Sequence, residues 1–257
     1  MDLKRHVPNI ITLLNLLSGS IAVIFAVQGS LIMAAVFVAL GIFFDFFDGL
    51  AARALDVKSE VGLQLDSLAD AVTSGVVPGI VMYQMLNIAL PNTSSGTSTE
   101  WNVDDTILEW SFNNLALIGL LITLASAYRL AKFNVDDRQT DSFIGLPTPA
   151  NALLILSLPL ILSFQPGEIL SSLILNEWFL IGLTLLSCYL LNAEVKLFAL
   201  KFSDWSFKNN KVRYIFIILC LLLVIFLQFA AVPVIIISYV LLSLIFGDQK
   251  KEVEVEY

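Results

Sequence analysis

Long apolar runs recur along this chain, separated by short polar stretches. A helix that crosses a bilayer needs about 20 predominantly apolar residues, and eight runs approach that length. We place them at about 9–28, 31–51, 63–86, 112–133, 151–168, 177–199, 213–230 and 232–247. The run 151–168 is the weakest because it contains Pro159, and only the stretch around Pro233 divides the last two. The pattern predicts an all-α polytopic membrane bundle of about eight transmembrane helices, forming a single domain over residues 1–257.

Basic residues mark one side of this arrangement. With eight spans both termini lie on the same side, and all 14 Lys and Arg residues fall there. They are Lys4, Arg5, Arg53, Lys58, Arg129, Lys132, Arg138, Lys196, Lys201, Lys208, Lys211, Arg213, Lys250 and Lys251. The opposite connections carry only acids, among them Glu100, Asp104 and Glu168. By the positive-inside rule, both termini are predicted to be cytoplasmic, in a multi-pass protein of the cell membrane.

Composition supports the same class. The chain is 58% hydrophobic and 14% charged, with a mean hydropathy of +0.85, which excludes an ordinary soluble domain. We expect contacts with membrane lipid and none with nucleic acid. The basic start at Met1–His6 resembles that of a signal peptide, but no small-residue cleavage site follows, so we expect an uncleaved first span.

Four aspartates interrupt the second and third apolar runs. Asp45 and Asp48 are three residues apart and share one helix face, while Asp66 and Asp70 are four apart on the next helix. The two helices form a predicted hairpin over about 31–86, so the four carboxylates converge near the cytoplasmic interface. A carboxylate at the centre of a span costs ~2.5–3.5 kcal/mol on translocon scales. Something must therefore neutralise them.

Divalent cations are the natural partners for this cluster. Carboxylate oxygens suit Mg²⁺ or Mn²⁺, and two such ions can clamp a diphosphate. Gly49, Ala52 and Gly62 have almost no side chain, which leaves room for a bulky ligand, and Arg53 adds positive charge beside it. The alternatives are ion pairs with Lys or Arg, or a pathway for protons or sodium.

These residues carry a resemblance to a known family. Eight positions over a 26-residue frame match the signature of the CDP-alcohol phosphatidyltransferases: Asp45, Asp48, Gly49, Ala52, Arg53, Gly62, Asp66 and Asp70. The resemblance implies an integral-membrane enzyme that joins an alcohol to the phosphatidyl group of a CDP-activated lipid and releases CMP. It also implies a site with two metal ions, and relatives of this kind suggest a homodimer.

The resemblance further implies a role for each matching residue. Asp45, Asp48, Asp66 and Asp70 would be metal ligands, and Asp70 would also be the general base for the acceptor hydroxyl. Gly49, Ala52, Arg53 and Gly62 would contact the CDP moiety. Asn9 and Thr12, which form a polar stripe with Asn15 on one face of the first helix, are either further contacts to the nucleotide or polar groups that hold helices together.

Three segments resemble the phosphatidylserine synthase branch of the family. They are the start Pro8-Asn9-x2-Thr12-x2-Asn15, the segment Arg129-Leu130-Ala131-Lys132-Phe133-Asn134 and the stretch Gly145-Leu146-Pro147-Thr148-Pro149-Ala150. This branch transfers the phosphatidyl group of CDP-diacylglycerol to L-serine. Arg129 and Lys132 would receive the serine carboxylate, although simple anchoring at the cytoplasmic interface also explains basic residues there.

Other activities remain open at this point. A phosphatidylglycerophosphate synthase would also need cations, for a phosphate-bearing acceptor, and inositol-phosphate or cardiolipin-type relatives use the same aspartate signature. A carboxylate-based cation transporter belongs to another class, but it would place its acids near the bilayer midplane and often in broken helices. A non-catalytic scaffold gives no reason for the aspartate spacing.

Overall fold

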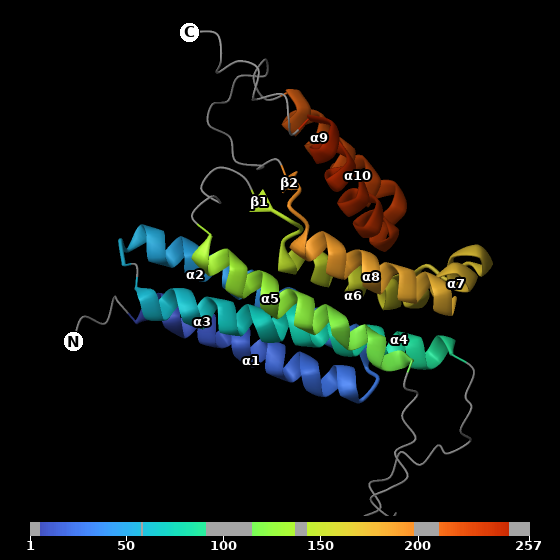
Figure 1. Ribbon diagram of the computed structural model, residues 1–257, viewed down its shortest axis with the longest axis horizontal. Coiled ribbons are helices and arrows are strands. Elements are labelled where there is room, and N and C mark those ends of the chain that lie inside the picture. The colour runs from blue at the N-terminus through green and yellow to red at the C-terminus, as the bar shows by residue number, and fades with distance from the viewer. Residues whose placement is uncertain (1–5, 58, 91–114, 137–142, 198–210, 247–257) are drawn as a thin grey trace, which may run out of the picture.

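The computed structural model describes residues 6–57, 59–90, 115–136, 143–197 and 211–246, and these parts are almost entirely helical (Figure 1). The long helices are α1 (Val7–Val27), α2 (Leu31–Ala54), α3 (Glu60–Asp70), α4 (Val77–Ala89), α5 (Leu121–Val135), α6 (Thr148–Phe164), α8 (Glu177–Asn192), α9 (Lys211–Leu227) and α10 (Ala231–Phe246). The short elements are the π-helical turn η2 (Ala71–Val76), the 3₁₀ turns η3 (Ala116–Leu120) and η4 (Gln228–Ala230), the helix α7 (Glu168–Ile174) and the strands β1 (Phe143–Ile144) and β2 (Lys196–Leu197).

The predicted all-α membrane bundle is confirmed, and each of the eight predicted runs contains a helix. By length and composition, five stretches could cross a membrane, or six if the bent pair α7–α8 counts as one span, while α6 is shorter. The count of eight spans therefore stays a prediction. So does the side on which the termini lie, because 1–5 and 247–257 are outside the described residues, as are several of the cations used to assign it: Lys4, Arg5, Lys58, Arg138, Lys201, Lys208, Lys250 and Lys251.

The last two helices form a hairpin. Phe216 of α9 and Tyr239 of α10 have ring centroids 5.7 Å apart, although a continuous helix would separate them by roughly 34 Å. The chain reverses at Gln228, whose φ is +48°. The side chain of Gln165, at the end of α6, holds this turn by donating to the Leu227 carbonyl at 3.0 Å and accepting from the Ala230 N–H at 3.0 Å. The predicted division of 213–230 from 232–247 is thus seen as two helices.

One predicted run ends too late. The run 177–199 stops being helical at Asn192, after which the chain is extended and β2 pairs antiparallel with β1. Gly145 explains this docking, because its φ is +75° and its N–H donates to the Val195 carbonyl at 2.9 Å. A Cβ there would lie 2.6 Å from the Leu191 carbonyl oxygen. The stretch from Gly145 to Pro149 is therefore a tight turn that begins α6.

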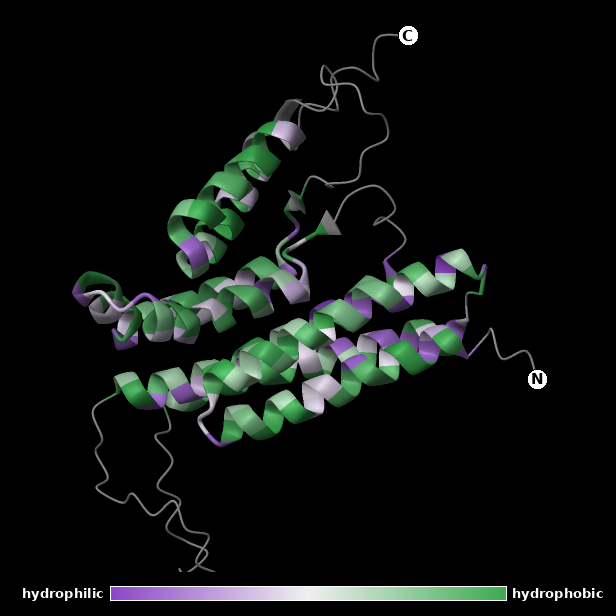
Figure 2. Cartoon of the chain, turned by 180° about the vertical axis from the view of Figure 1, so that it is seen from behind, coloured by the Kyte–Doolittle hydropathy of each residue, from purple (hydrophilic) through white to green (hydrophobic). Residues whose placement is uncertain are grey.

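The apolar core lies between α1, α2, α4, α6 and α8. Small side chains let the first two helices approach closely, and longer side chains of α4 and α6 fill the space behind them. Fully buried members of this core are Ala22, Ala26, Ala34, Val38, Val77, Val81, Met82, Leu86, Ile155 and Leu180. Figure 2 shows hydrophilic residues at the end where α1 and α3 begin and where α2 and α5 end, and also at the opposite end near α7.

The π-helical turn η2 packs against the crossing of α1 and α2. A Cβ on Gly19 would lie 2.3 Å from the Thr73 hydroxyl oxygen, and a Cβ on Gly41 would lie 2.7 Å from the Thr73 methyl carbon. Thr73 is fully buried and its hydroxyl donates to the Asn15 side-chain oxygen at 2.8 Å. Two glycines thus make the space in which the third apolar run meets the first two.

We expect Gly19→Ala to destabilise the protein. The added methyl group meets the Thr73 hydroxyl and also the Thr73 Cα at 3.1 Å, and overpacking of this kind costs roughly 1–3 kcal/mol. Thermal unfolding of the purified protein in detergent measures the change. Gly182→Ala in α8 is the control, since nothing lies within 4 Å of the added Cβ. A Gly19→Ala midpoint equal to that of this control would contradict the packing argument.

Candidate functional site

Three of the four predicted aspartates form a compact group. Asp45 and Asp48 lie near the end of α2 and Asp66 lies in α3, and one carboxylate oxygen from each falls within 4.8 Å of the other two. Asp48 is buried, and Asp45 and Asp66 are half-buried. This group could hold a metal ion. Asp70 lies one turn further along α3 and outside the group of three, so its role as a metal ligand stays a prediction.

The polar stripe of α1 positions two of these carboxylates. The Thr12 hydroxyl donates to Asp48 Oδ2 at 2.5 Å. The Asn15 amide donates to Asp70 Oδ1 at 3.3 Å, and its oxygen accepts from Thr73 in η2. Thr12 and Asn15 are both buried. The stripe therefore holds helices together through the aspartates themselves, and its contact with the nucleotide stays a prediction.

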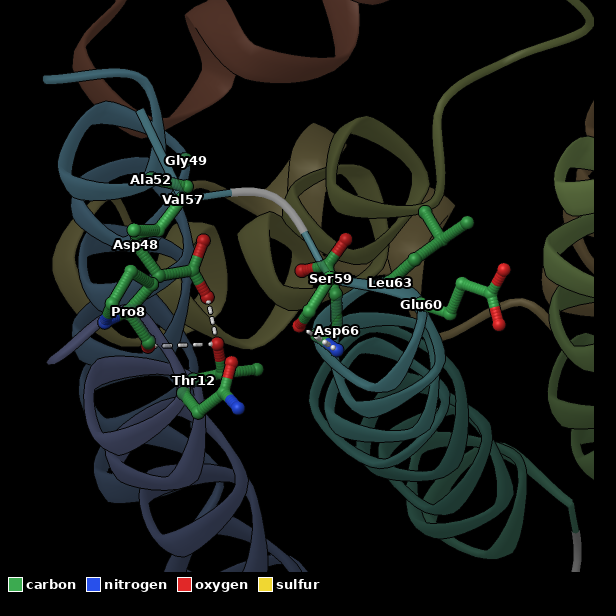
Figure 3. Close-up of a pocket in the computed structure, with 12 residues that line it drawn as sticks. Pro8, Thr12, Asp48, Gly49, Ala52, Val57, Ser59, Glu60, Leu63 and Asp66 are labelled. Atoms are coloured by element: carbon green, nitrogen blue, oxygen red, sulfur yellow. Dashed lines mark hydrogen bonds between the residues drawn. The ribbon is translucent and has the colours of Figure 1, made fainter. Parts of the chain in front are cut away.

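A cavity of about 470 Å³ adjoins the carboxylate group. Figure 3 shows Thr12 and Asp48 on one wall, from α1 and α2, and Ser59 and Asp66 on the other, from the start of α3. The residues that line it are Pro8, Asn9, Thr12, Asp48, Gly49, Ala52, Val57, Ser59, Glu60, Gly62, Leu63 and Asp66. Five of the six predicted CDP contacts are thus brought together, namely Asn9, Thr12, Gly49, Ala52 and Gly62.

The two cavity glycines differ in what surrounds them. A Cβ on Gly62 would lie 3.1 Å from the Asn9 side-chain oxygen and 3.0 Å from Ser59 Oγ, so Gly62 serves the close packing of α3 on α1. A Cβ on Gly49 would meet only an Arg53 nitrogen, at 3.9 Å. Packing does not require a glycine at 49. The space beside it belongs to the cavity.

Arg53, the sixth predicted CDP contact, does not line the cavity. It is exposed, and its Nε donates to the Gly49 carbonyl in its own helix at 3.0 Å. Sequence analysis missed Ser59, whose hydroxyl caps α3 by accepting from the Gly62 N–H at 2.9 Å. A serine just before an apolar periodic stretch is the usual signal for a helix start, so this residue could have been found.

The two predicted acceptor residues of α5 have different surroundings. Arg129 is only 7% exposed, its charge lies near enough to interact with that of Asp70, and its Nε has no partner among the described residues. Lys132 instead forms an ion pair with Glu194 at 3.5 Å, partly exposed to the surroundings. Glu194 was missed because it lies far along the chain, just beyond α8. A hydrogen-bonded pair, Ser67 and Asn134, ties α5 to α3.

The negative charge of the three aspartates is better explained by binding of a metal cation than by ion pairs with Lys or Arg. Within the described part of the chain, no Lys or Arg lies at ion-pair distance from Asp45, Asp48 or Asp66. Asp66 Oδ1 is buried and has no hydrogen-bond partner there. Carboxylates left unpaired away from water are costly, and hard oxygen donors of this kind are those that Mg²⁺ and Mn²⁺ prefer. The residues present therefore fit a divalent metal ion.

Comparisons with known proteins point to one family. Residues 5–189 match the family model described as CDP-alcohol phosphatidyltransferase. A protein of Bacillus subtilis (strain 168) named CDP-diacylglycerol–serine O-phosphatidyltransferase is 31% identical over 166 residues, which cover 65% of this chain and 80% of that protein. The helices α9 and α10 lie beyond the matched residues.

Two further relatives show the same pattern over a shorter part of their length. A protein of Helicobacter pylori (strain J99), also named CDP-diacylglycerol–serine O-phosphatidyltransferase, is 28% identical over 151 residues, or 58% of this chain and 54% of that protein. An archaetidylserine synthase of Methanothermobacter thermautotrophicus is 30% identical over 153 residues, or 58% of this chain and 56% of that protein. The chain spans about half the length of these two relatives.

We expect purified protein to bind Mn²⁺, with an affinity that depends on the group of three and on its support from α1. Asp66→Asn should abolish the binding because it removes a charged ligand. Thr12→Val should weaken it about tenfold, the lower end of the usual effect of groups that orient a ligand.

Electron paramagnetic resonance of Mn²⁺ titrated into the protein measures both effects. Thr184→Val is the matched control, because Thr184 is also fully buried but its hydroxyl bonds only to the Leu180 carbonyl of its own helix. Equal Mn²⁺ affinity in wild type and Asp66→Asn would refute the metal site.

Proposed function

Because this chain belongs to the CDP-alcohol phosphatidyltransferase family, we propose that it transfers the phosphatidyl group of CDP-diacylglycerol to L-serine, giving phosphatidylserine and CMP. The observation that carries the proposal is the position of the group of three aspartates beside the cavity. Asp48 and Asp66 both belong to the group and line the cavity at its side, so a nucleotide in the cavity has its phosphates beside the site for metal ions.

Serine as the acceptor is supported by two kinds of observation. The three relatives described above carry serine in their names, although the lipid of one is archaetidyl rather than diacylglycerol. In this chain a buried Arg129 lies near Asp70, so a cationic group for a carboxylate stands beside a base for a hydroxyl. Serine carries both of these groups on neighbouring carbons.

The donor lies in the cavity between α1, α2 and α3 in this proposal. The open space beside Gly49 and Ala52 receives the cytidine, while Asn9 and Thr12 supply polar atoms from α1. Asp45, Asp48 and Asp66 would hold Mg²⁺ or Mn²⁺, two ions with Asp70 included, and the bound metal would supply charge neutralisation for the diphosphate and for the leaving CMP. The acyl chains remain in the bilayer, and the site faces the cytoplasm.

The transfer itself uses Asp70 as the proton acceptor. Asn15 holds one of its carboxylate oxygens, and the other takes the proton from the serine hydroxyl. The serine oxygen forms a bond to the phosphorus that carries diacylglycerol, and the bond from that phosphorus to the CMP oxygen breaks. Arg129 binds the serine carboxylate and holds the hydroxyl in line with the phosphorus, so the rate gain comes largely from orientation.

A second cation close by, Lys132, plays a smaller part than the sequence indicated. Its ammonium group already pairs with Glu194, whereas Arg129 Nε is unpartnered within the described residues. The carboxylate of serine would accept a hydrogen bond from Arg129 Nε, which otherwise has no partner within the described residues. We assign the carboxylate to Arg129 and an outer, supporting position to Lys132.

The acceptor is tested by CMP release from purified protein supplied with CDP-diacylglycerol and Mg²⁺ or Mn²⁺. L-Serine should drive release at a rate well above the rate with glycerol 3-phosphate or inositol, and a chelator should abolish it. Release driven by glycerol 3-phosphate or inositol instead would replace serine as the acceptor. No release with any acceptor, from protein that does not bind the CDP-lipid, would favour a transporter.

Asp70→Asn should reduce turnover by about 10²-fold or more, which is the usual contribution of a positioned base, and should retain binding of the CDP-lipid. The amide keeps the size of the side chain but cannot take a proton. Single-turnover CMP release and equilibrium binding of labelled CDP-diacylglycerol give the two quantities. Turnover close to that of the wild type would remove Asp70 from the proposed role of base.

A further inference from the structure

Several buried polar atoms have no hydrogen-bond partner within the described residues. They are Asp66 Oδ1, Ser74 Oγ, Ser126 Oγ, Arg129 Nε, both amide atoms of Asn151, Ser187 Oγ and Asn192 Oδ1. Leaving such a group unpaired costs about 1–3 kcal/mol. Asp66 belongs to the group of three aspartates already described. Of the remainder, Ser74 lies four residues beyond Asp70, and Ser126 lies one turn before Arg129 in α5.

Ser74 and Ser126, like Ser187 of α8, differ from most buried hydroxyls of the described helices. A hydroxyl inside a helix commonly donates to a carbonyl three or four residues earlier, as Ser157 does to Leu154 at 2.6 Å and Thr184 does to Leu180 at 2.8 Å. Ser74 and Ser126 are equally buried, with 0% of their surface exposed, but make no such bond. Ser74 lies in the π-helical turn η2, and such turns occur frequently at functional sites.

Ser74 and Ser126 come from two elements that pack tightly on each other. A Cβ on Gly75, next to Ser74, would lie 3.2 Å from the Ser126 Cβ. The Thr123 hydroxyl donates to the Gly75 carbonyl at 3.1 Å and fixes this contact. Ser126 is one turn from Arg129 in α5, and Ser74 is four residues beyond Asp70. Ser74 and Ser126 thus lie about one helical turn along the chain from the proposed base and from the proposed carboxylate receptor, in elements that pack on each other.

We propose that Ser74 and Ser126 bind the ammonium group of a zwitterionic amino-acid acceptor whose carboxylate is held by Arg129. This inference rests on the proposed function. It assigns a partner to the ammonium group of serine, which is the one group of the acceptor that the proposed function leaves without a partner. An ammonium offers three donors, and a hydroxyl oxygen can accept while its own proton turns elsewhere. Two hydroxyls suit this task better than a carboxylate would, because they leave the charge of Arg129 and Asp70 undisturbed.

These two hydroxyls would select for an amino acid over other alcohols. Glycerol 3-phosphate and inositol have no ammonium, so they would bury Ser74 and Ser126 without a cationic partner. A site built around hydrogen bonds rejects analogues that cannot make them, since its own polar groups then remain unpaired. The two serines are specificity-determining residues in this inference, and neither takes part in proton transfer.

The test measures the serine KM of Ser126→Ala and Ser74→Ala by CMP release at saturating CDP-diacylglycerol. Each should raise the serine KM about tenfold or more, the usual effect of losing a hydrogen bond to a charged group, with the KM for CDP-diacylglycerol unchanged. Ser157→Ala is the matched control, as a buried helical serine whose hydroxyl already has a partner. It should leave the serine KM unchanged.

An analogue separates ammonium binding from general damage to the site. 3-Hydroxypropionate has the hydroxyl and carboxylate of serine but no ammonium, so its inhibition constant should be the same in wild type, Ser126→Ala and Ser74→Ala. A parallel rise for serine and the analogue, or no rise for serine in either variant, would overturn the inference and leave the proposed function standing. A wild type that does not respond to serine would refute the proposed function itself.

Discussion

Mutual repulsion among clustered carboxylates is the interaction on which the rest of this structure depends. Three acidic groups share a space of 4.8 Å at the polar end of an apolar bundle, where charges are weakly screened and costly to bury. No basic residue of the described chain neutralises them, while Thr12 donates one of the few hydrogen bonds they receive. The uncompensated negative charge of these carboxylates favours the binding of cations. This charge, more than any single contact, makes the adjoining cavity suitable for a metal-bound diphosphate.

Close packing of the helices holds the aspartates in position. Gly19 and Gly41 admit Thr73 to the crossing of α1 and α2, and Thr73 in turn fixes the Asn15 side chain that holds Asp70. Stability and the candidate site are thus linked through the same small residues: the glycines have no functional groups, yet they set how far Asp70 stands from the group of three. Replacing either glycine would therefore shift Asp70, although neither glycine lines the cavity.

The parts that the sequence predicts well are those with a local physical signal. Twenty-residue apolar runs predicted the helices, and the three-residue spacing of Asp45 and Asp48 predicted their shared face; convergence with Asp66 followed once the two helices were taken as a hairpin. The pairing of Lys132 with Glu194 has no such signal, because it joins distant parts of the chain. The late end given to the run 177–199 is a similar case, since Val195 and Leu197 are apolar but serve the docking of Gly145 and β1. Ser74 and Ser126 look like ordinary small residues until their lack of partners is seen.

The π-helical turn η2 bears on what a deletion in the segment from α3 to α4 would do. A π turn accommodates one more residue than the α-helical turn it replaces, and each residue advances an α-helix by about 100°. Because the wider turn takes up the extra residue within Ala71–Val76, α3 and α4 keep roughly the relative orientation that a continuous α-helix one residue shorter would give them. Deleting one residue there would let the segment run as a continuous α-helix in which the aspartates and the buried methionines of α4 keep their faces, while the residues of the turn itself, such as Thr73, would lose their positions. The extra residue is thus dispensable for the orientation of α3 and α4, and what depends on it is the place of Thr73 beside Asn15.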